Sequence, residues 1–135
     1  MAKAANNWQL QQAFTHHLEQ TKAHVQRLEK VFGELDENPK GKKCKAMEGL
    51  IEEGKEMMNE DAEPEVMDAA LIAAAQRVEH YEIAGYGCAR TFARQLGHEE
   101  AANLLQQTLD EEAETDKKLT QIAESMVNLQ AAHQA

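Results

Sequence analysis

Two stretches of this sequence place a glutamate in the middle of an otherwise small and apolar helical face. At about 100° per residue, one face of the first stretch carries Glu82 among these residues: Leu71, Ala75, Val78, Gly85 and Ala89. The corresponding face of the second stretch carries Glu112 among these: Ala101, Leu105, Thr108, Leu119, Ala123 and Met126. A buried carboxylate is costly to ionise unless a cation or a firm hydrogen bond compensates. Two such carboxylates, on helices joined by a short turn, are typical of half of a metal site.

Helical spacing of apolar residues extends over most of the chain and predicts three long helices and a short one. We expect these helices at about Trp8 to Leu35, Lys43 to Met58, Pro64 to Gln95 and His98 to Asn128, with a frayed tail after the last. Asn7 is a suitable N-cap, Pro64 suits a first helical position, and Gly97 suits a left-handed C-cap. Because proline and glycine are scarce, at 2 and 7 residues, the sequence predicts an all-α fold and a single domain over residues 1–135.

The short connection around Gly97 makes the last two long helices an antiparallel hairpin. The connection between the first and third helices carries the short helix, and its length permits a crossover along the bundle. Three long helices leave a four-sided bundle with one wall missing, which either the short helix or another subunit must fill. We expect oligomerisation, as a homodimer or a higher homo-oligomer.

The composition excludes several classes of function. The formal net charge of -10 argues against charge-driven binding of nucleic acid or of an anionic membrane surface. Since there is no run of about 18 apolar residues and no secretory signal at the start, we expect a cytoplasmic protein. Cys44 and Cys88 are then free thiols, unless the fold brings them together as a disulfide. No Ser/His/Asp arrangement, phosphate-binding glycine loop or Cys-x-x-Cys pair supports a hydrolase or a thiol redox enzyme.

Further candidate ligands lie one helical turn from the two glutamates and on the first helix. Glu79 precedes Glu82 by one turn, and Asp116 follows Glu112 by one turn. His17 and His24 lie two turns apart, at the margin of an apolar line formed by these residues: Phe14, Leu18, Val25, Leu28 and Phe32.

Other interpretations of these residues compete with metal binding. The Glu-x-x-His spacing that is common in dinuclear carboxylate bundles is absent around both glutamates, so buried polar hydrogen bonding is the alternative. Glu79 could meet solvent, the two histidines could be structural, and His80 is expected at the surface. In the acidic run from Glu111 to Glu114, only Glu112 is expected to point inward.

Four segments in order resemble a known group of proteins. They are His17-Leu18-Glu19-Gln20-Thr21, Lys43-Cys44-Lys45-Ala46-Met47-Glu48-Gly49-Leu50, Val78-Glu79-His80-Tyr81-Glu82-Ile83-Ala84 and Leu105-Gln106-Gln107-Thr108-Leu109-Asp110-Glu111-Glu112. Together they resemble the bacterial YciF/YciE family of ferritin-like, stress-associated proteins. The resemblance implies a ferritin-like helical bundle, a dinuclear site of the iron type and a dimer. It carries over Glu82 and Glu112 as site positions, joined by Glu79, Asp116, His17 and His24.

The resemblance also implies two departures from the family. Family members carry a further helix before the position that matches Met1, and that helix looks like a source of a ligand. Some members carry Glu where this chain has Gln20.

We therefore expect a ferritin-like metal-binding protein with a carboxylate and histidine site between its helices, acting in stress or in metal and oxidant handling. Iron is the expected cation, with manganese or zinc as alternatives, and any turnover would be oxidation of Fe(II) by oxygen or peroxide. The rival hypothesis is a non-enzymatic helical assembly protein whose metal site is incomplete. Inward Glu82 and Glu112 favour the first hypothesis, whereas Gln20 and the missing helix favour the second.

Overall fold

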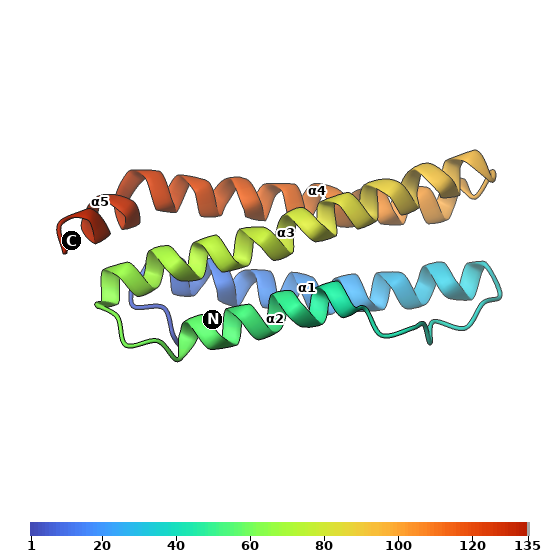
Figure 1. Ribbon diagram of the computed structural model, residues 1–135. Helices are drawn as coiled ribbons and strands as arrows, with labels where there is room; N and C mark the ends of the chain where they lie inside the picture. The colour runs from blue at the N-terminus through green and yellow to red at the C-terminus, as the bar shows by residue number, and fades with distance from the viewer. Residues whose placement is uncertain (135) are drawn as a thin grey trace.

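The computed structural model describes residues 1–134, and the described chain is helical without strands. The helices are α1 (Trp8–Glu34), α2 (Lys45–Met58), α3 (Pro64–Gln95) and α4 (Glu99–Ile122), followed by the π-helical turn η1 (Ala123–Val127) and by α5 (Asn128–Ala132) (Figure 1). The all-α prediction is confirmed, and the predicted bounds of the first three helices hold to within two residues.

Local sequence signals explain where the long helices begin and end. The Asn7 side chain accepts hydrogen bonds from the backbone N–H groups of Gln9 and Leu10, at 2.9 and 3.2 Å, and so caps α1. Pro64 is the first residue of α3, where its missing N–H costs nothing. Gly97 follows α3 with a φ of 81°, which turns the chain into α4.

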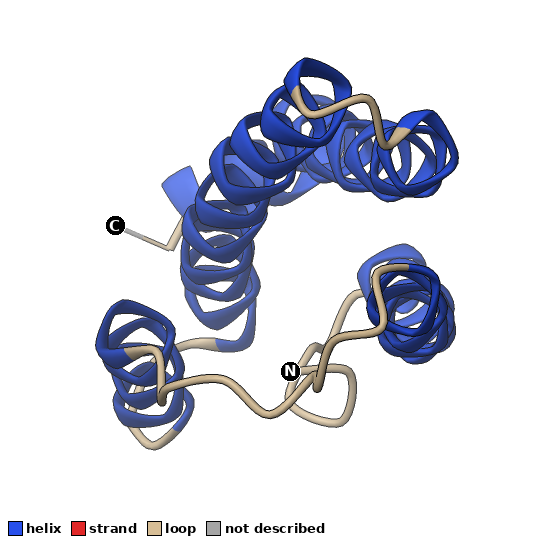
Figure 2. Cartoon of the chain, turned by 90° about the vertical axis from the view of Figure 1, so that its right-hand side faces the viewer, coloured by secondary structure: helices blue, strands red, loops and turns tan. Residues whose placement is uncertain are grey.

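The long helices form an open bundle in which α4 lies between α1 and α3. α1 and α3 run in the same direction, whereas α2 and α4 run in the opposite one (Figure 1). The starts of α1 and α3 are tied together by Asp68, whose two carboxylate oxygens accept from the backbone N–H groups of Asn6 and Asn7 at 2.7 Å each. α2 packs on the side of α3 away from α4, and Figure 2 shows α1 and α2 well apart when the molecule is viewed from its end.

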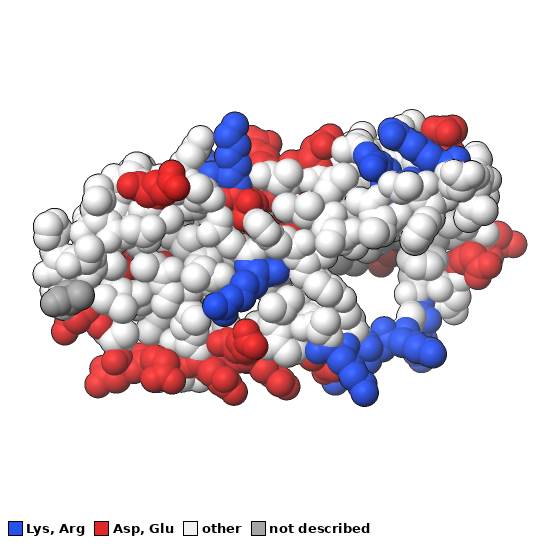
Figure 3. Space-filling view, turned by 45° about the horizontal axis from the view of Figure 1, so that its top comes forward, with Lys and Arg blue, Asp and Glu red and all other residues white. Residues whose placement is uncertain are grey.

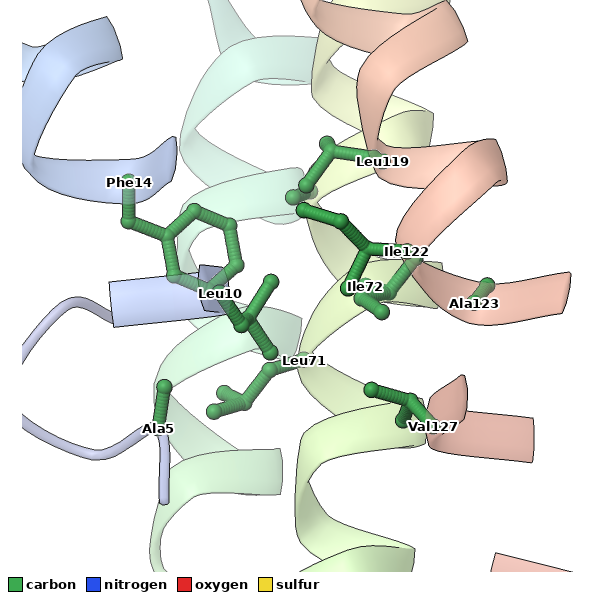
Figure 4. Packing of buried hydrophobic residues seen from close by; sticks show 10 residues of the cluster. Ala5, Leu10, Phe14, Leu71, Ile72, Leu119, Ile122, Ala123 and Val127 are labelled. Carbon is green, nitrogen blue, oxygen red and sulfur yellow. The ribbon is translucent and has the colours of Figure 1, made fainter. Parts of the chain in front are cut away.

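Two apolar clusters flank a polar layer along the bundle. The larger cluster brings together the starts of α1 and α3 with the end of α4 and η1, and Figure 4 shows its side chains meeting between these helices. Its centre consists of Leu10, Leu71 and Leu119, none more than 1% exposed. The smaller cluster joins Val31 to Ala101 and Leu105, near the α3–α4 turn. The residues predicted as ligands on α1, α3 and α4 fall between the two clusters in sequence.

The buried face of α1 differs from the predicted one. Leu18 and Val25 are 52% and 53% exposed, whereas His24 is only 2% exposed. The prediction that the histidines lie at the margin of the buried face is therefore wrong for His24. The reason is that α4 packs against the face of α1 that carries Phe14, His24 and Val31, which leaves one apolar edge of the helix uncovered.

The later part of α3 also departs from prediction. Gly85 and Ala89 were expected on the buried face but are exposed. Glu79, which had solvent exposure as an alternative, is buried instead at 3% exposure, while Glu82 is half-buried. The buried face of this part of α3 therefore differs from the predicted one. The reason lies in its packing partners, because α4 covers one side of the helix and the side that faces the gap between α1 and α2 stays open.

The end of the bundle is longer than predicted. The helix was expected to end at Asn128, but helical structure continues to Ala132. The π-helical turn η1 adds one residue to a turn and so shifts the side-chain register by one position. As a result, Val127 is 1% exposed and occupies the core, where Met126 was predicted.

Acidic side chains outnumber basic ones, which gives the net charge of -10, and Figure 3 shows many of the acidic side chains along one edge of the molecule. Of the described helices, none combines the length and the hydropathy that a membrane span needs. Both cysteines are free and exposed, so the expected absence of a disulfide is confirmed.

Candidate metal centre

Three helices each contribute one side chain to a compact cluster in the polar layer. His17 of α1, Glu79 of α3 and Glu112 of α4 each offer a ligand atom, and all three atoms lie within 4.8 Å of one another. Nε2 of His17 is 3.2 Å from Oε1 of Glu79 and 3.5 Å from Oε2 of Glu112. The structure thus brings together three of the six residues that the sequence predicted as ligands.

His24 lies on the other side of the Glu112 carboxylate. Its Nδ1 is 3.0 Å from Oε1 of Glu112, the oxygen that does not face His17. The two imidazole rings are 6.3 Å apart between centroids. Glu112 therefore presents one oxygen to each histidine, which is the arrangement of a carboxylate that bridges two positions.

Two of these three separations match the spacing of atoms that share a cation, and the third, 3.5 Å between Nε2 of His17 and Oε2 of Glu112, is slightly longer. Nitrogen and oxygen ligands about 2.1 Å from one divalent ion, at angles of 90° to 109°, lie about 3.0 to 3.4 Å apart. The distances from His17 to Glu79 and from His24 to Glu112, at 3.2 and 3.0 Å, fall in that range. His17 and His24, both on α1, thus each bring a ring nitrogen to the Glu112 carboxylate of α4.

Unpartnered buried atoms point to the same fit. Glu112 is fully buried, and neither of its carboxylate oxygens has a hydrogen-bond partner among the described residues. Oε2 of Glu79 and Nδ1 of His24 are also buried without a hydrogen-bond partner among the described residues. Leaving such groups unsatisfied costs about 1–3 kcal/mol each. A cation beside each histidine would satisfy both oxygens of Glu112 and Nδ1 of His24.

The pKa shifts of the glutamates in the polar layer show that, without a cation, burial disfavours their ionised form. Burial, assisted by the nearby carboxylates, raises the pKa of Glu112 to about 9. Burial also raises the pKa of Glu82, with a further contribution from Glu79. Burial alone would lower the pKa of His17, but the hydrogen bond and charge of Glu79 outweigh it and raise that pKa. The pKa of His24 is lowered, chiefly by burial.

Further contacts hold His24 through its other ring nitrogen, and these contacts were not predicted from the sequence. Nε2 of His24 lies 2.6 Å from Oε2 of Glu111, a residue that was expected in solvent. Arg27 donates to both oxygens of Glu111, at 3.1 and 3.0 Å, and also to Oγ1 of Thr108 at 2.7 Å. The expectation for Glu111 is wrong because the α1–α4 interface also includes this residue, which comes directly before Glu112. Arg27, one turn after His24, was the available signal.

Asp116 lies outside the cluster. Its Oδ1 is 3.1 Å from Nε2 of the exposed His80 and accepts a hydrogen bond from Gln76 at 3.0 Å. The predicted surface position of His80 is confirmed. About one turn after Glu112, the residue that reaches the cluster is Thr115 rather than Asp116. The Thr115 hydroxyl is 3.1 Å from Nδ1 of His17.

The cluster opens onto a groove between α1 and α2, with α3 as its floor. The groove has a volume of about 420 Å³, and His17, Glu79 and Glu82 reach its wall. Glu82 also borders a neighbouring apolar cavity of about 330 Å³ that contains Tyr81 and Tyr86. The Tyr86 ring meets His24 edge-on at 6.4 Å between centroids, and burial raises the pKa of its hydroxyl to about 12. Small molecules and hydrated ions therefore have a route to Glu82.

Fold and side chains together define a ferritin-like helical bundle with a carboxylate and histidine layer between its helices. Residues 1–132 match the family described as "Domain of unknown function (DUF892)", and the chain belongs to this family. It is 52% identical to protein YciF of Escherichia coli K12 over 137 residues, which cover 100% of this chain and 82% of that protein.

Two solved structures share this fold. The crystal structure of the E. coli stress protein YciF matches with a TM-score of 0.89 and 52% identity, over 94% of this chain and 80% of that one. A protein of Rhodopseudomonas palustris, described as "YcfI, a putative structural protein", matches with a TM-score of 0.85 and 43% identity, over 88% of this chain and 76% of that one. The resemblance inferred from the four sequence segments is thereby confirmed.

Proposed function

We propose that this chain binds divalent cations in the layer between α1, α3 and α4. His17, Glu79 and Glu112 would hold one cation, and His24 with the second oxygen of Glu112 would hold another. Glu82, half-buried beside Glu79, is placed to add an oxygen ligand from the groove side. The observation that carries the proposal is the fully buried Glu112 carboxylate, which faces a histidine on each side and has no hydrogen-bond partner within residues 1–134.

The choice of cation follows from the mixed donor set. Carboxylate oxygens and imidazole nitrogens suit iron, manganese and zinc, and we propose iron as the resident metal. Iron would supply electron transfer to oxygen or peroxide at this layer. The residues of the chain orient and neutralise the site, and the groove beside Glu82 admits a small oxidant. The similarity to the E. coli stress protein YciF supports a role in stress, to which this metal centre would contribute.

Metal content of protein purified without chelators tests the proposal. Glu112→Gln keeps the size of the side chain but removes its charge, and should lose most of the bound metal. The matched control is Glu114→Gln, which changes an exposed glutamate on the same helix and should keep it. Wild-type protein that holds no iron, manganese or zinc after anaerobic loading would contradict the proposal.

The second candidate is a non-enzymatic assembly protein. Its supporting observation is the uncovered apolar edge of the groove, where Leu18 and Ile51 are 52% and 47% exposed, and which Val25 of α1, 53% exposed, continues beyond the groove. A second copy of this chain covering that edge would form a homodimer, and the R. palustris relative is described as a putative structural protein. Sedimentation of the wild type and of Leu18→Glu tests it. A dimer that becomes a folded monomer in the variant is expected, and a wild-type monomer at micromolar concentration would refute self-association.

A further inference from the structure

The contacts of Glu111 suggest a role beyond holding α1 to α4. Both of its oxygens accept hydrogen bonds from the Arg27 guanidinium, at 3.1 and 3.0 Å, and a guanidinium can only donate. Oε2 of Glu111 is in addition 2.6 Å from Nε2 of His24. A carboxylate that already accepts from Arg27 on both oxygens is an acceptor, so the hydrogen in this short contact belongs to His24.

This assignment fixes which nitrogen of His24 is free. With the proton on Nε2, a neutral imidazole has its lone pair on Nδ1. Nδ1 is buried, has no hydrogen-bond partner in the part of the chain that the structure describes, and lies 3.0 Å from Oε1 of Glu112. Two acceptors at this distance repel each other unless a cation or a proton lies between them.

We propose that Glu111, braced by Arg27, is a positioning residue that sets the His24 tautomer and presents Nδ1 to a cation shared with Glu112. The inference rests on the proposed metal centre and assigns the residues that prepare one of its two positions. A carboxylate behind a ligating histidine fixes the ring and raises its basicity, and loss of such a partner typically costs 10- to 100-fold in metal affinity. Thr108 of α4 also accepts a hydrogen bond from Arg27, at 2.7 Å, and so helps to fix the position of the guanidinium.

The first arm of the test needs no metal. Long-range ¹H–¹⁵N correlation spectra of the histidine side chains in the metal-free protein report the tautomer of His24. The expected result is a protonated Nε2 and an unprotonated Nδ1 in the wild type, and a mixture of tautomers in Glu111→Ala. Glu111→Gln retains an acceptor oxygen and should keep the wild-type tautomer. A wild-type His24 protonated on Nδ1, or no change in Glu111→Ala, overturns the inference.

The second arm measures Co(II) binding and its visible spectrum. Wild-type protein should bind two Co(II) ions, and Glu111→Ala should weaken one of them about 10- to 100-fold and change its spectrum. Glu111→Gln should restore much of that affinity, and the exposed Glu114→Ala should behave as wild type. If wild-type and Glu111→Ala proteins bind Co(II) equally, with identical spectra, the positioning role fails although the metal centre stands. If the wild type binds no Co(II), the proposed function fails and this inference fails with it.

Discussion

The cation-free protein should become less stable as the pH rises, and Glu112 should be the main cause. Its pKa is raised from 4.5 to about 9, first by burial and then by the neighbouring carboxylates. Between these values the folded state holds a proton that the unfolded state has released, so the free energy of unfolding falls with increasing pH. One proton corresponds to about 1.4 kcal/mol per pH unit, which gives a loss of about 3 kcal/mol between pH 5 and pH 7.

Other groups in the layer modify this dependence in known directions. The raised pKa of His17 contributes stability below its unfolded value of 6.5, and this contribution is lost as the pH rises through the folded value. The lowered pKa of His24 has the opposite effect, since stability increases with pH up to 6.5. A comparison of the wild type with a variant of Glu112 alone therefore isolates the glutamate better than the wild-type curve does.

Urea unfolding in the presence of a chelator, at pH 5, 6, 7 and 8, makes this comparison. Glu112→Gln cannot ionise and fills nearly the same volume, so its stability should fall between pH 5 and pH 7 by about 3 kcal/mol less than that of the wild type. Glu114→Gln should follow the wild type. Parallel curves for the wild type and Glu112→Gln would show that Glu112 is ionised in the folded protein and would refute the reasoning.

Three further predictions concern the scaffold and the surface. Asp68→Ala removes the acceptor of two backbone N–H groups at the start of α1, and should cost about 2–3 kcal/mol in urea unfolding at pH 7. Gly97→Ala forces a side chain into a φ of 81° and should cost about 1 kcal/mol by the same assay, although the space around it is open. The Tyr81 hydroxyl lies 3.0 Å from the Cys44 sulfur and lowers the pKa of that thiol, so Tyr81→Phe should slow alkylation of Cys44 by iodoacetamide near neutral pH, as followed by mass spectrometry. An equal or faster rate in the variant would contradict that assignment.

The helices could be predicted from the sequence because their signals are local. Asn7, Pro64 and Gly97 act on neighbouring backbone groups, and periodic apolar residues mark the extent of each helix. The π-helical turn after Ile122 has no comparable local signal in the chain, so the sequence pattern could not show that Val127 rather than Met126 occupies the core.

The membership of the candidate cluster was predicted only in part, because the side of a helix that becomes buried depends on its neighbours. His17, Glu79 and Glu112 could be named from spacing, but spacing could not show that His24 is more buried than Leu18. Asp116 was a reasonable candidate by helical period, but it contacts Gln76 and His80 of α3 instead, and such contacts depend on how α3 and α4 pack against each other.

The contacts behind the candidate ligands were the least predictable from the sequence. Glu111 and Glu112 are adjacent and identical in chemistry, but Glu111 accepts hydrogen bonds from Arg27, whereas Glu112 has no hydrogen-bond partner among the described residues. Only the relative rotation of α1 and α4 decides which of the two faces the cluster.

The most direct measurement is a crystal structure of the protein grown with Co(II) or Fe(II), with anomalous data collected at the absorption edge of the metal. The proposal predicts an anomalous peak about 2.1 Å from Nε2 of His17 and from carboxylate oxygens of Glu79 and Glu112, and a second peak beside Nδ1 of His24. Peaks confined to surface sites such as His80 and Asp116, or a layer without any peak, would contradict it.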